Sequence, residues 1–563
     1  MQADKIFYHG LIHTMAGAGL NNATTMAESS QLAYPDDVQA IAIKDNKILA
    51  VGSDEEICAL AGEGTQMIDL KGACICPGFN DSHCHIMLTG MKFRRLSLRG
   101  AKSVEEIIER GKAYIREHDL QEGEWIWGDG YDHNIFDEPR ILDGRDAEAI
   151  STQFPVVLER VCGHIACANS KALEIIGYDE NTYIEGGLLE KDEEGRLTGV
   201  IVEAALDEFK NRGPHASEAL IREIFLDIQA RANACGLTSM QTDDWEGVDL
   251  DALMKVESEL EAEGKMTIRI WEEIQTARMP VLNEFLARGL KSGDGTPFFK
   301  IGNIKLLTDG SLGSRTANMR KEYLDDPGNT GVQVYEQEDL DEIVLTAHKA
   351  GLQMACHAIG DGAAEQVISA YTKAWEYDHK DLRNRIVHGQ FIDDDQMEKM
   401  LAAHIAVDAQ PPFIPSDVPL LESRMGVRAD KMGYRWASLK RKGIHIAGGS
   451  DSPVESFAPL WGIYCAVNRP ASHETAHQDP IPAFLPGEAL TPREALELYT
   501  TDAAYFSFEE NEKGKLLPGY LADFVILEES PLRTDPRKID QIKVLATYVD
   551  GRCVYHPEEI IHG

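Results

Sequence analysis

The sequence has no run of eighteen or more apolar residues, so it predicts no membrane-spanning helix. Its start, MQADKIFYHGLIHTM, lacks the basic segment followed by an apolar segment that marks a secretory signal peptide. The ten cysteines contain no C-x-x-C pair, a pattern that favours free thiols in a reducing compartment over a disulfide framework. We therefore expect a cytoplasmic protein that does not act at a membrane.

Basic residues are few relative to acidic ones. The chain has 55 Lys and Arg against 94 Asp and Glu, which gives a formal net charge of −39. A surface of that sign repels phosphate backbones and anionic lipids, so we expect no nucleic-acid partner. The 563 residues, 43% of them hydrophobic, are enough for a large core and, at ~100–200 residues per domain, for several domains.

The two ends of the chain share a pattern that is typical of β-strands. Near the N-terminus two segments are apolar-rich or alternate, and near the C-terminus an apolar strand precedes a hairpin with an Asp-Gly turn. These segments are 5–15, 39–52, 522–527 and 544–555. Because they flank a long middle of different character, we expect both ends to meet in one small β domain.

The middle of the chain alternates short β-rich runs with stretches that carry a helical charge pattern. Repeated βα units predict a parallel sheet, and eight of them predict a closed (β/α)₈ barrel of the α/β class. The eight expected strands are 73–83, 236–242, 267–273, 302–310, 352–358, 385–390, 405–410 and 445–452. The segment between the first two is several times longer than one βα unit of ~30 residues, so it must hold an insertion.

These patterns define the expected domains. Residues 73–508 form the barrel, with the insertion at about 100–215. Residues 1–72 and 509–563 form the two parts of a β-sandwich. The sandwich is composite, because its parts come from opposite ends of the chain.

Four histidines and one aspartate stand near the carboxyl ends of expected barrel strands. His83 and His85, in NDSHCHIM, are two residues apart, which places both rings on the same face of a strand. His357, His388 and Asp451 each follow an apolar run and precede glycine or polar loop residues. Active sites of this barrel lie at that end of the strands, and imidazole with carboxylate is a ligand set for transition metals. For any single histidine the alternative is a hydrogen-bonded core residue.

Lys305 lies inside an apolar run, IGNIKLLTDGS, on the expected fourth strand. A charged lysine is costly there, and burial favours the neutral amine, which can react with CO₂ to form a carbamate. The two carbamate oxygens could bridge two metal ions. A lysine paired with a carboxylate, such as Asp309, is the alternative that these residues leave open.

Seven motifs carry a resemblance to a known family and run in order along nearly the whole chain. They are PGFNDSHCH (77–85), GHIACANSKAL (163–173), IKLLTDGSLGSRTA (304–317), CHAIGDGA (356–363), RIVHGQ (385–390), GGSDSPV (448–454) and LPGYLADFVIL (517–527). The chain resembles the amidohydrolase superfamily, in particular its amidohydrolase-3 branch of YtcJ-like and N-substituted formamide deformylase-like proteins. The resemblance implies a metal-dependent barrel with a composite β-sandwich, in agreement with the strand patterns.

The resemblance also implies a role for each ligand candidate. His83 and His85 would hold the more buried metal ion. Lys305, as a carbamate, would bridge to a second ion held by His357 and His388. The implied cofactor is a divalent metal, expected to be zinc, as two ions or as one.

The implied activity is hydrolysis of a non-peptide C–N bond of the amide type, in an N-acyl or N-formyl compound, by water that the metal activates. Asp451 would bind metal and also manage the proton. Other reactions on the same scaffold remain open, namely deamination, lyase or isomerase chemistry, as does a non-catalytic metal-binding relative. The expected partner is a small-molecule substrate, and the family resemblance favours a homodimer.

Four further residues are candidates with weaker signals. His164 could orient the substrate carbonyl or stabilise its oxyanion, or it could be a packing or loop histidine. Asn169, in the same motif, is expected to face the substrate pocket. Arg315 could contact an anionic substrate group or form a surface ion pair, and Asp81 could support His83 or be a turn residue.

Overall fold

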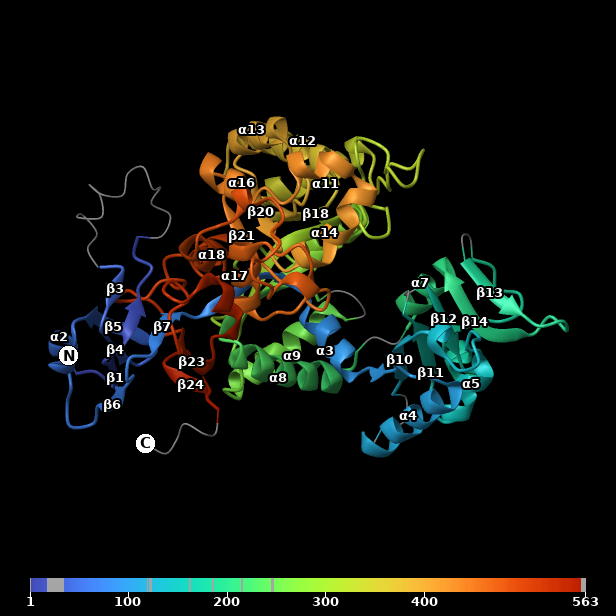
Figure 1. Cartoon of the computed structure of the whole chain (residues 1–563), viewed down its shortest axis with the longest axis horizontal. Helices are drawn as coiled ribbons and strands as arrows, with labels where there is room; N and C mark the ends of the chain where they lie inside the picture. Colours follow the sequence, from blue (N-terminus) through green and yellow to red (C-terminus); the bar gives the residue numbers. More distant parts are fainter. Residues whose placement is uncertain are drawn as a thin grey trace. The chain divides into compact units, whose positions relative to one another are not determined.

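The computed structural model describes residues 2–17, 35–118, 120, 124–161, 164–184, 187–213, 216–244 and 248–557 (Figure 1). Contacts divide the chain into two compact units. Unit 1 comprises Met1–Leu88, Ile221–Trp245 and Leu250–Gly563, and unit 2 comprises Thr89–Leu220 and Glu246–Asp249. No helix among the described residues has the length and apolar character needed to cross a bilayer.

Unit 1 contains an eight-stranded parallel sheet that forms a nearly closed barrel, as predicted. Its strands, in their order around the sheet, are β8 (Phe79–Cys84), β15 (Leu237–Thr242), β16 (Arg269–Gln275), β17 (Phe299–Leu307), β18 (Met354–Ala358), β19 (Arg385–His388), β20 (Ala406–Ala409) and β21 (Ile446–Gly448). Every residue of β8 and β15 is buried. Continuous burial is expected for parallel strands that are covered on both faces, which is why apolar runs marked them in the sequence.

Helices separate the barrel strands along the chain, as the charge patterns predicted. They are α8 (Glu218–Ala234), α9 (Leu250–Ala262), α10 (Met279–Ala287), α11 (Gln337–Ala350), α12 (Asp361–Asp378), α13 (Asp394–Ala402), α14 (Phe413–Arg424), α15 (Ala429–Met432) and α16 (Trp436–Lys442). Helices α17 (Pro459–Asn468), α18 (Pro492–Leu498) and α19 (Thr501–Phe506) follow β21. Local signals set their ends: Asp393 and Gln396 form a capping box at the start of α13, and Gly351 ends α11 in the left-handed conformation.

The first and last barrel strands meet through their ends. The backbone N–H of Asp451, just beyond β21, donates to the carbonyl of His83 at 2.8 Å. The carboxylate of Asp81 accepts the N–H of Ser450 at 3.0 Å and that of His83 at 3.2 Å. Asp81 therefore fixes β8 against the loop that carries Asp451 through hydrogen bonds to backbone N–H groups.

Strands from both ends of the chain form the remaining sheets of unit 1 (Figure 1). One sheet has the order β24 (Arg552–Tyr555), β23 (Val544–Val549), β22 (Phe524–Leu527), β7 (Cys74–Pro77), β2 (Leu11–His13) and β3 (Asp37–Val38). The other has the order β5 (Lys47–Gly52), β4 (Ala40–Lys44), β1 (Lys5–Tyr8) and β6 (Gln66–Asp69). Phe7, Phe524 and Tyr548 pack together in their shared core, so the two ends of the chain do build one β domain.

The expected first barrel strand, 73–83, is in fact two strands. Residues Cys74–Pro77 pair with β22 in the composite sheet, and Phe79–Cys84 pair with β15 in the barrel. Gly78 separates them, and a Cβ there would lie 2.3 Å from the Thr238 side chain. The chain passes from one sheet to the other at a point that only glycine fits, and a continuous apolar run does not reveal such a break.

The larger segment of unit 2, Thr89–Leu220, lies between β8 and β15 in the sequence and includes the expected insertion at about 100–215. Its sheet has the order β13 (Gly187–Lys191), β14 (Leu197–Glu203), β12 (Ile165–Ala168), β11 (Val156–Arg160), β10 (Ile126–Tyr131) and β9 (Leu96–Ser97). Its helices are α4 (Val104–Glu117), α5 (Gly144–Ile150), α6 (Ser170–Ile176) and α7 (Ala204–Asn211). Val156 and Leu158 belong to one apolar core and Val157 to another, so both faces of the sheet are covered.

Candidate metal centre

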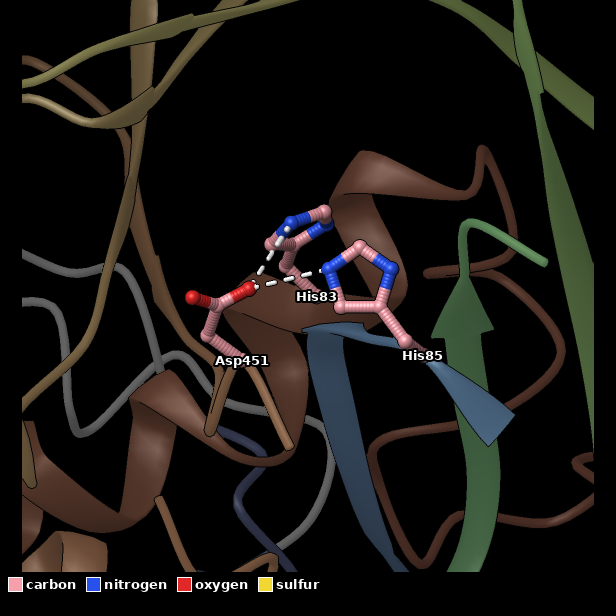
Figure 2. A group of neighbouring side chains, drawn as sticks. All are labelled: His83, His85 and Asp451. Carbon is pink, nitrogen blue, oxygen red and sulfur yellow. Dashed lines mark hydrogen bonds and ion pairs between the residues drawn. The ribbon is translucent and has the colours of Figure 1, made fainter. Parts of the chain in front are cut away.

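His83 of β8, His85 just beyond β8 and Asp451 from beyond β21 come together at the carboxyl end of the barrel (Figure 2). The Oδ1 atom of Asp451 lies 3.1 Å from Nε2 of His85 and 3.4 Å from Nε2 of His83. One potential ligand atom of each residue lies within 4.8 Å of those of the other two. His83 and His85 are two residues apart, and both rings face the carboxylate of Asp451 (Figure 2).

Asp451 reaches this position in a backbone conformation that is unusual for a residue other than glycine. Its φ is 55°, and His388, at the end of β19, has a φ of 75°. Such conformations cost about 1–3 kcal/mol each and concentrate at functional sites. The hydrogen bond from the backbone N–H of Asp451 to the carbonyl of His83 holds the aspartate in place despite this cost.

Each of the four histidines has its Nδ1 atom beside an oxygen acceptor. The pairs are His83 with Glu273 Oε2 at 3.2 Å, His85 with the Asp243 carbonyl at 2.7 Å, His357 with Asp309 Oδ1 at 3.0 Å, and His388 with Gln410 Oε1 at 2.8 Å. In the neutral form of each ring, an acceptor at Nδ1 favours the tautomer that carries its proton there, which would free the lone pair of Nε2 for a metal.

His357 and His388 form a second pair beside the first. Their ring centroids lie 4.5 Å apart, and the ring of His388 is 6.0 Å from that of His83. Burial, together with electrostatic repulsion from the neighbouring His357 and His83 rings, lowers the pKa of His388 well below its usual value, although Asp451 opposes this. His388 is therefore neutral, which is the protonation state of a metal ligand.

Lys305 is buried next to His83. Its Nζ lies 3.0 Å from Nε2 of His83, 3.5 Å from Asp243 Oδ2 and 3.9 Å from Glu273 Oε2. The carboxylates near this lysine are thus Asp243 and Glu273. Asp309, which the sequence offered as its partner, instead accepts backbone N–H groups from Asn318, Ile359 and Gly360.

The charges of the centre fit a divalent cation. Burial raises the pKa of Asp451, but hydrogen bonds from His83 and His85 outweigh it and hold that pKa well below the usual value. Burial lowers the pKa of His85, but the hydrogen bond to Asp451 outweighs it and raises that pKa to about 9, so a metal would bind this ring in exchange for its proton. An ionised carboxylate with two imidazole rings is a donor set that zinc and similar metals prefer. The residues present therefore fit a metal site at His83, His85 and Asp451.

Sequence reasoning did not single out Asp243, Glu273 or Gln410. Glu273 ends the run TIRIWEE and Gln410 ends IAVDAQ, so each is a polar residue within or at the end of an apolar strand. A polar residue at a buried strand position is costly unless it has a partner, and this signal was available. The identity of that partner follows only from the order of the strands in the folded barrel, where β16, β17 and β20 lie beside their neighbours.

The remaining candidates take other partners. His164 lies in unit 2, more than half exposed, with Nδ1 3.1 Å from Oε2 of Glu203. Arg315 makes two hydrogen bonds to Asp325, at 3.2 and 3.0 Å, so it forms the ion pair that was the alternative to substrate contact.

Asn169 is buried at the N-terminus of α6. Its Oδ1 accepts the N–H groups of Val156 and Ala172, each at 3.0 Å, and its Nδ2 donates to the carbonyls of Ser151 and Phe154, each at 2.8 Å. All four bonds go to the backbone of unit 2. We therefore assign Asn169 a structural role instead of the expected place in a substrate pocket.

The chain is similar along most of its length to known proteins. Residues 66–555 match the model of the amidohydrolase family. YtcJ of Bacillus subtilis (strain 168) is 33% identical over 98% of this chain and 99% of its own. N-substituted formamide deformylase of Arthrobacter pascens is 23% identical over 92% of this chain and 95% of its own.

A solved structure shares the fold. An uncharacterized metal-dependent hydrolase from Pyrococcus furiosus is 27% identical and aligns with a TM-score of 0.76 over 94% of this chain and 100% of its own. The long family match, the similarity to YtcJ and the convergence of His83, His85 and Asp451 all point the same way. The chain belongs to the amidohydrolase family.

Proposed function

We propose that this protein hydrolyses a non-peptide C–N bond of the amide type, in an N-acyl or N-formyl small molecule. The observation that carries the proposal is the convergence of His83, His85 and Asp451 at the carboxyl end of the barrel. That end is where the active sites of this fold lie. The similarity to a deformylase of N-substituted formamides supports an amide-type substrate.

His83, His85 and Asp451 would hold one divalent metal, which we propose is zinc. Lys305, as a carbamate, would bridge to a second ion held by His357 and His388. When bound, a divalent metal there supplies a water of lowered pKa and polarises the substrate carbonyl. The Lys305 amine would lose a proton as its nitrogen bonds to the carbon of CO₂, and its position beside His83 places the product next to the first ion.

Asp451 would act as the proton carrier. It accepts a proton from the attacking water and passes it to the nitrogen that leaves when the C–N bond breaks. The bond from its own N–H to His83 fixes its position while it does so. We propose that His164 orients the substrate carbonyl or stabilises its oxyanion. Arg315 and Asn169 have structural roles instead.

The test combines metal content with turnover. Pure protein is analysed for metals and then assayed on a panel of N-formyl and N-acyl amides, with and without added zinc. We expect zinc-dependent turnover, which His85→Ala and Asp451→Asn abolish and which His404→Ala, on an exposed surface histidine, leaves intact. Full activity of metal-free protein, or no turnover of any amide by zinc-loaded protein, would overturn the proposal.

The carbamate has its own test. Protein loaded with zinc in ¹³C-labelled bicarbonate is examined by carbon NMR for a carbamate resonance, with Lys305→Gln as the matched control. We expect a resonance in the wild type that is missing from the variant. A free amine at Lys305 in fully zinc-loaded protein would remove the bridge and leave the site at His83, His85 and Asp451 standing.

A further inference from the structure

A fully buried arginine binds four side chains in the interior of the barrel. Arg385, on β19, donates through Nη1 to Gln241 at 2.7 Å and through Nη2 to Glu273 at 2.6 Å and Asn303 at 2.7 Å. Its Nε lies 2.9 Å from Oδ2 of Asp408. These partners come from β15, β16, β17 and β20, so one guanidinium group connects five of the eight barrel strands.

The two carboxylates in this network are as deeply buried as the arginine. The side chains of Glu273, Asp408 and Arg385 are all 0% exposed. A buried carboxylate without a cation is strongly unfavourable, and the planar fork of arginine can bind several oxygens at once. Arg385 therefore determines where the carboxylate of Glu273 can sit.

Glu273 connects the arginine to the metal centre. Its Oε1 accepts from Arg385, while its Oε2 lies 3.2 Å from Nδ1 of His83. The opposite ring nitrogen of His83, Nε2, faces Asp451 at 3.4 Å and Lys305 at 3.0 Å. The orientation of the ring that presents a ligand atom to the metal thus depends on a carboxylate that Arg385 holds.

We propose that Arg385 is a positioning residue of the metal centre, which acts through Glu273 on His83 and so sets the affinity for the divalent metal. The inference rests on the proposed metal site and extends it to a residue that reaches neither metal nor substrate. Groups that orient a ligating histidine typically change metal affinity by about 10–100-fold when they are replaced. Packing alone is the competing role, since Arg385 also lies over the Phe506 ring, 5.2 Å from its centroid.

The experiment measures the affinity for Zn²⁺ by competition with a chromophoric chelator, which requires no substrate. Arg385→Lys keeps the charge and loses the fork, and Glu273→Gln keeps the shape and loses the charge. We expect each to weaken zinc binding by about 10–100-fold. The double variant should bind no more weakly than Glu273→Gln alone, because both changes break the same connection.

Arg269→Lys is the matched control. Arg269 is a second buried barrel arginine, on β16, and it binds Asp523 and Asp550 at 2.6 Å each, with no contact to His83. We expect this variant to lower the thermal unfolding midpoint while it leaves zinc affinity unchanged. Equal loss of zinc affinity in both lysine variants, or wild-type affinity in Arg385→Lys, would reduce Arg385 to a packing role.

A second set of variants protects the test against misfolding. If Arg385→Lys does not fold, Glu273→Asp and Asn303→Ala are measured instead. Glu273→Asp draws the carboxylate away from His83, so it should weaken zinc binding, whereas Asn303→Ala removes one partner of Arg385 and should have the smaller effect. The reverse order contradicts the inference. If the wild type binds zinc but turns over no substrate, the proposed hydrolysis is contradicted and the inference about Arg385 is not.

Discussion

The Nε2 atom of His85 lies 3.1 Å from Oδ1 of Asp451, although 366 residues separate them in the sequence. The first lies just beyond β8 and the second just beyond β21, so the pair exists only when the first and last strands of the barrel meet. A metal that binds both residues binds the closed barrel and not the unfolded chain. Metal binding and barrel closure should therefore stabilise each other.

Removal of the metal should lower the unfolding temperature of unit 1. A ligand at 100 times its dissociation constant stabilises the folded state by about 2.7 kcal/mol. We expect zinc to raise the calorimetric midpoint of the wild type and to have little effect on Asp451→Asn or His85→Ala. His404→Ala, the surface control, should respond like the wild type. A wild-type response in Asp451→Asn would show that zinc acts elsewhere.

Replacement of Arg315 should leave substrate binding nearly unchanged. Its guanidinium is already bound to Asp325, and a partly exposed ion pair of this kind contributes about 0–1 kcal/mol to stability. We expect Arg315→Ala to keep KM within about twofold of the wild type, because Asp325 already occupies the guanidinium group. A tenfold change in KM would correspond to about 1.4 kcal/mol of binding free energy. Steady-state kinetics on an active amide measures this. A tenfold rise in KM at unchanged kcat would return Arg315 to the substrate site.

Loss of the Asn169 side chain should destabilise unit 2. Asn169→Ala removes a helix cap and leaves two buried N–H groups and two carbonyls without their side-chain partner, which should cost about 2–4 kcal/mol. Asn169→Asp keeps the two accepting bonds, so it should lose less. Limited proteolysis of unit 2 and thermal unfolding compare the three proteins. Zinc affinity should stay at the wild-type value in both variants.

Much of the fold follows from the sequence because parallel strands are buried on both faces. That burial requires continuous apolar runs, and all eight expected barrel strands overlap observed ones. The break at Gly78 could not be read in this way, since β7 and β8 are both apolar and differ only in the strands that they pair with. Pairing between distant segments is set by the folded chain, not by local pattern.

The metal-ligand candidates could be found because the active site of this barrel lies at the carboxyl ends of its strands, so a polar residue at such an end is a candidate. His83, His85 and Asp451 were placed by their position at strand ends, and the structure brings them together. The residues behind them were not found. Glu273 and Arg385 are charged groups in apolar strands, which shows that each needs a partner but not which partner it has.

Acid should destabilise unit 1 partly through Glu509. Burial raises the pKa of this carboxyl, but Lys513 and Lys300, with side-chain nitrogens 2.6 and 2.7 Å away, outweigh it and lower the pKa from 4.5 to about 2. A group whose pKa is lowered by folding stabilises the protein above its unfolded pKa and loses that contribution as the pH falls toward its folded pKa. Between pH 5 and pH 3 the loss should be roughly 2 kcal/mol.

Glu509→Gln should remove this part of the acid dependence. The difference in stability between wild type and variant is expected to be large near neutral pH and to shrink steadily as the pH falls from 5 to 3. Thermal unfolding of both proteins at half-unit pH steps measures it, with Glu512→Gln, an exposed neighbour, as the control for the loss of one acidic group. A difference that stays constant down to pH 3 would mean that Glu509 takes up its proton at a higher pH, and that the two lysines do not hold it ionised.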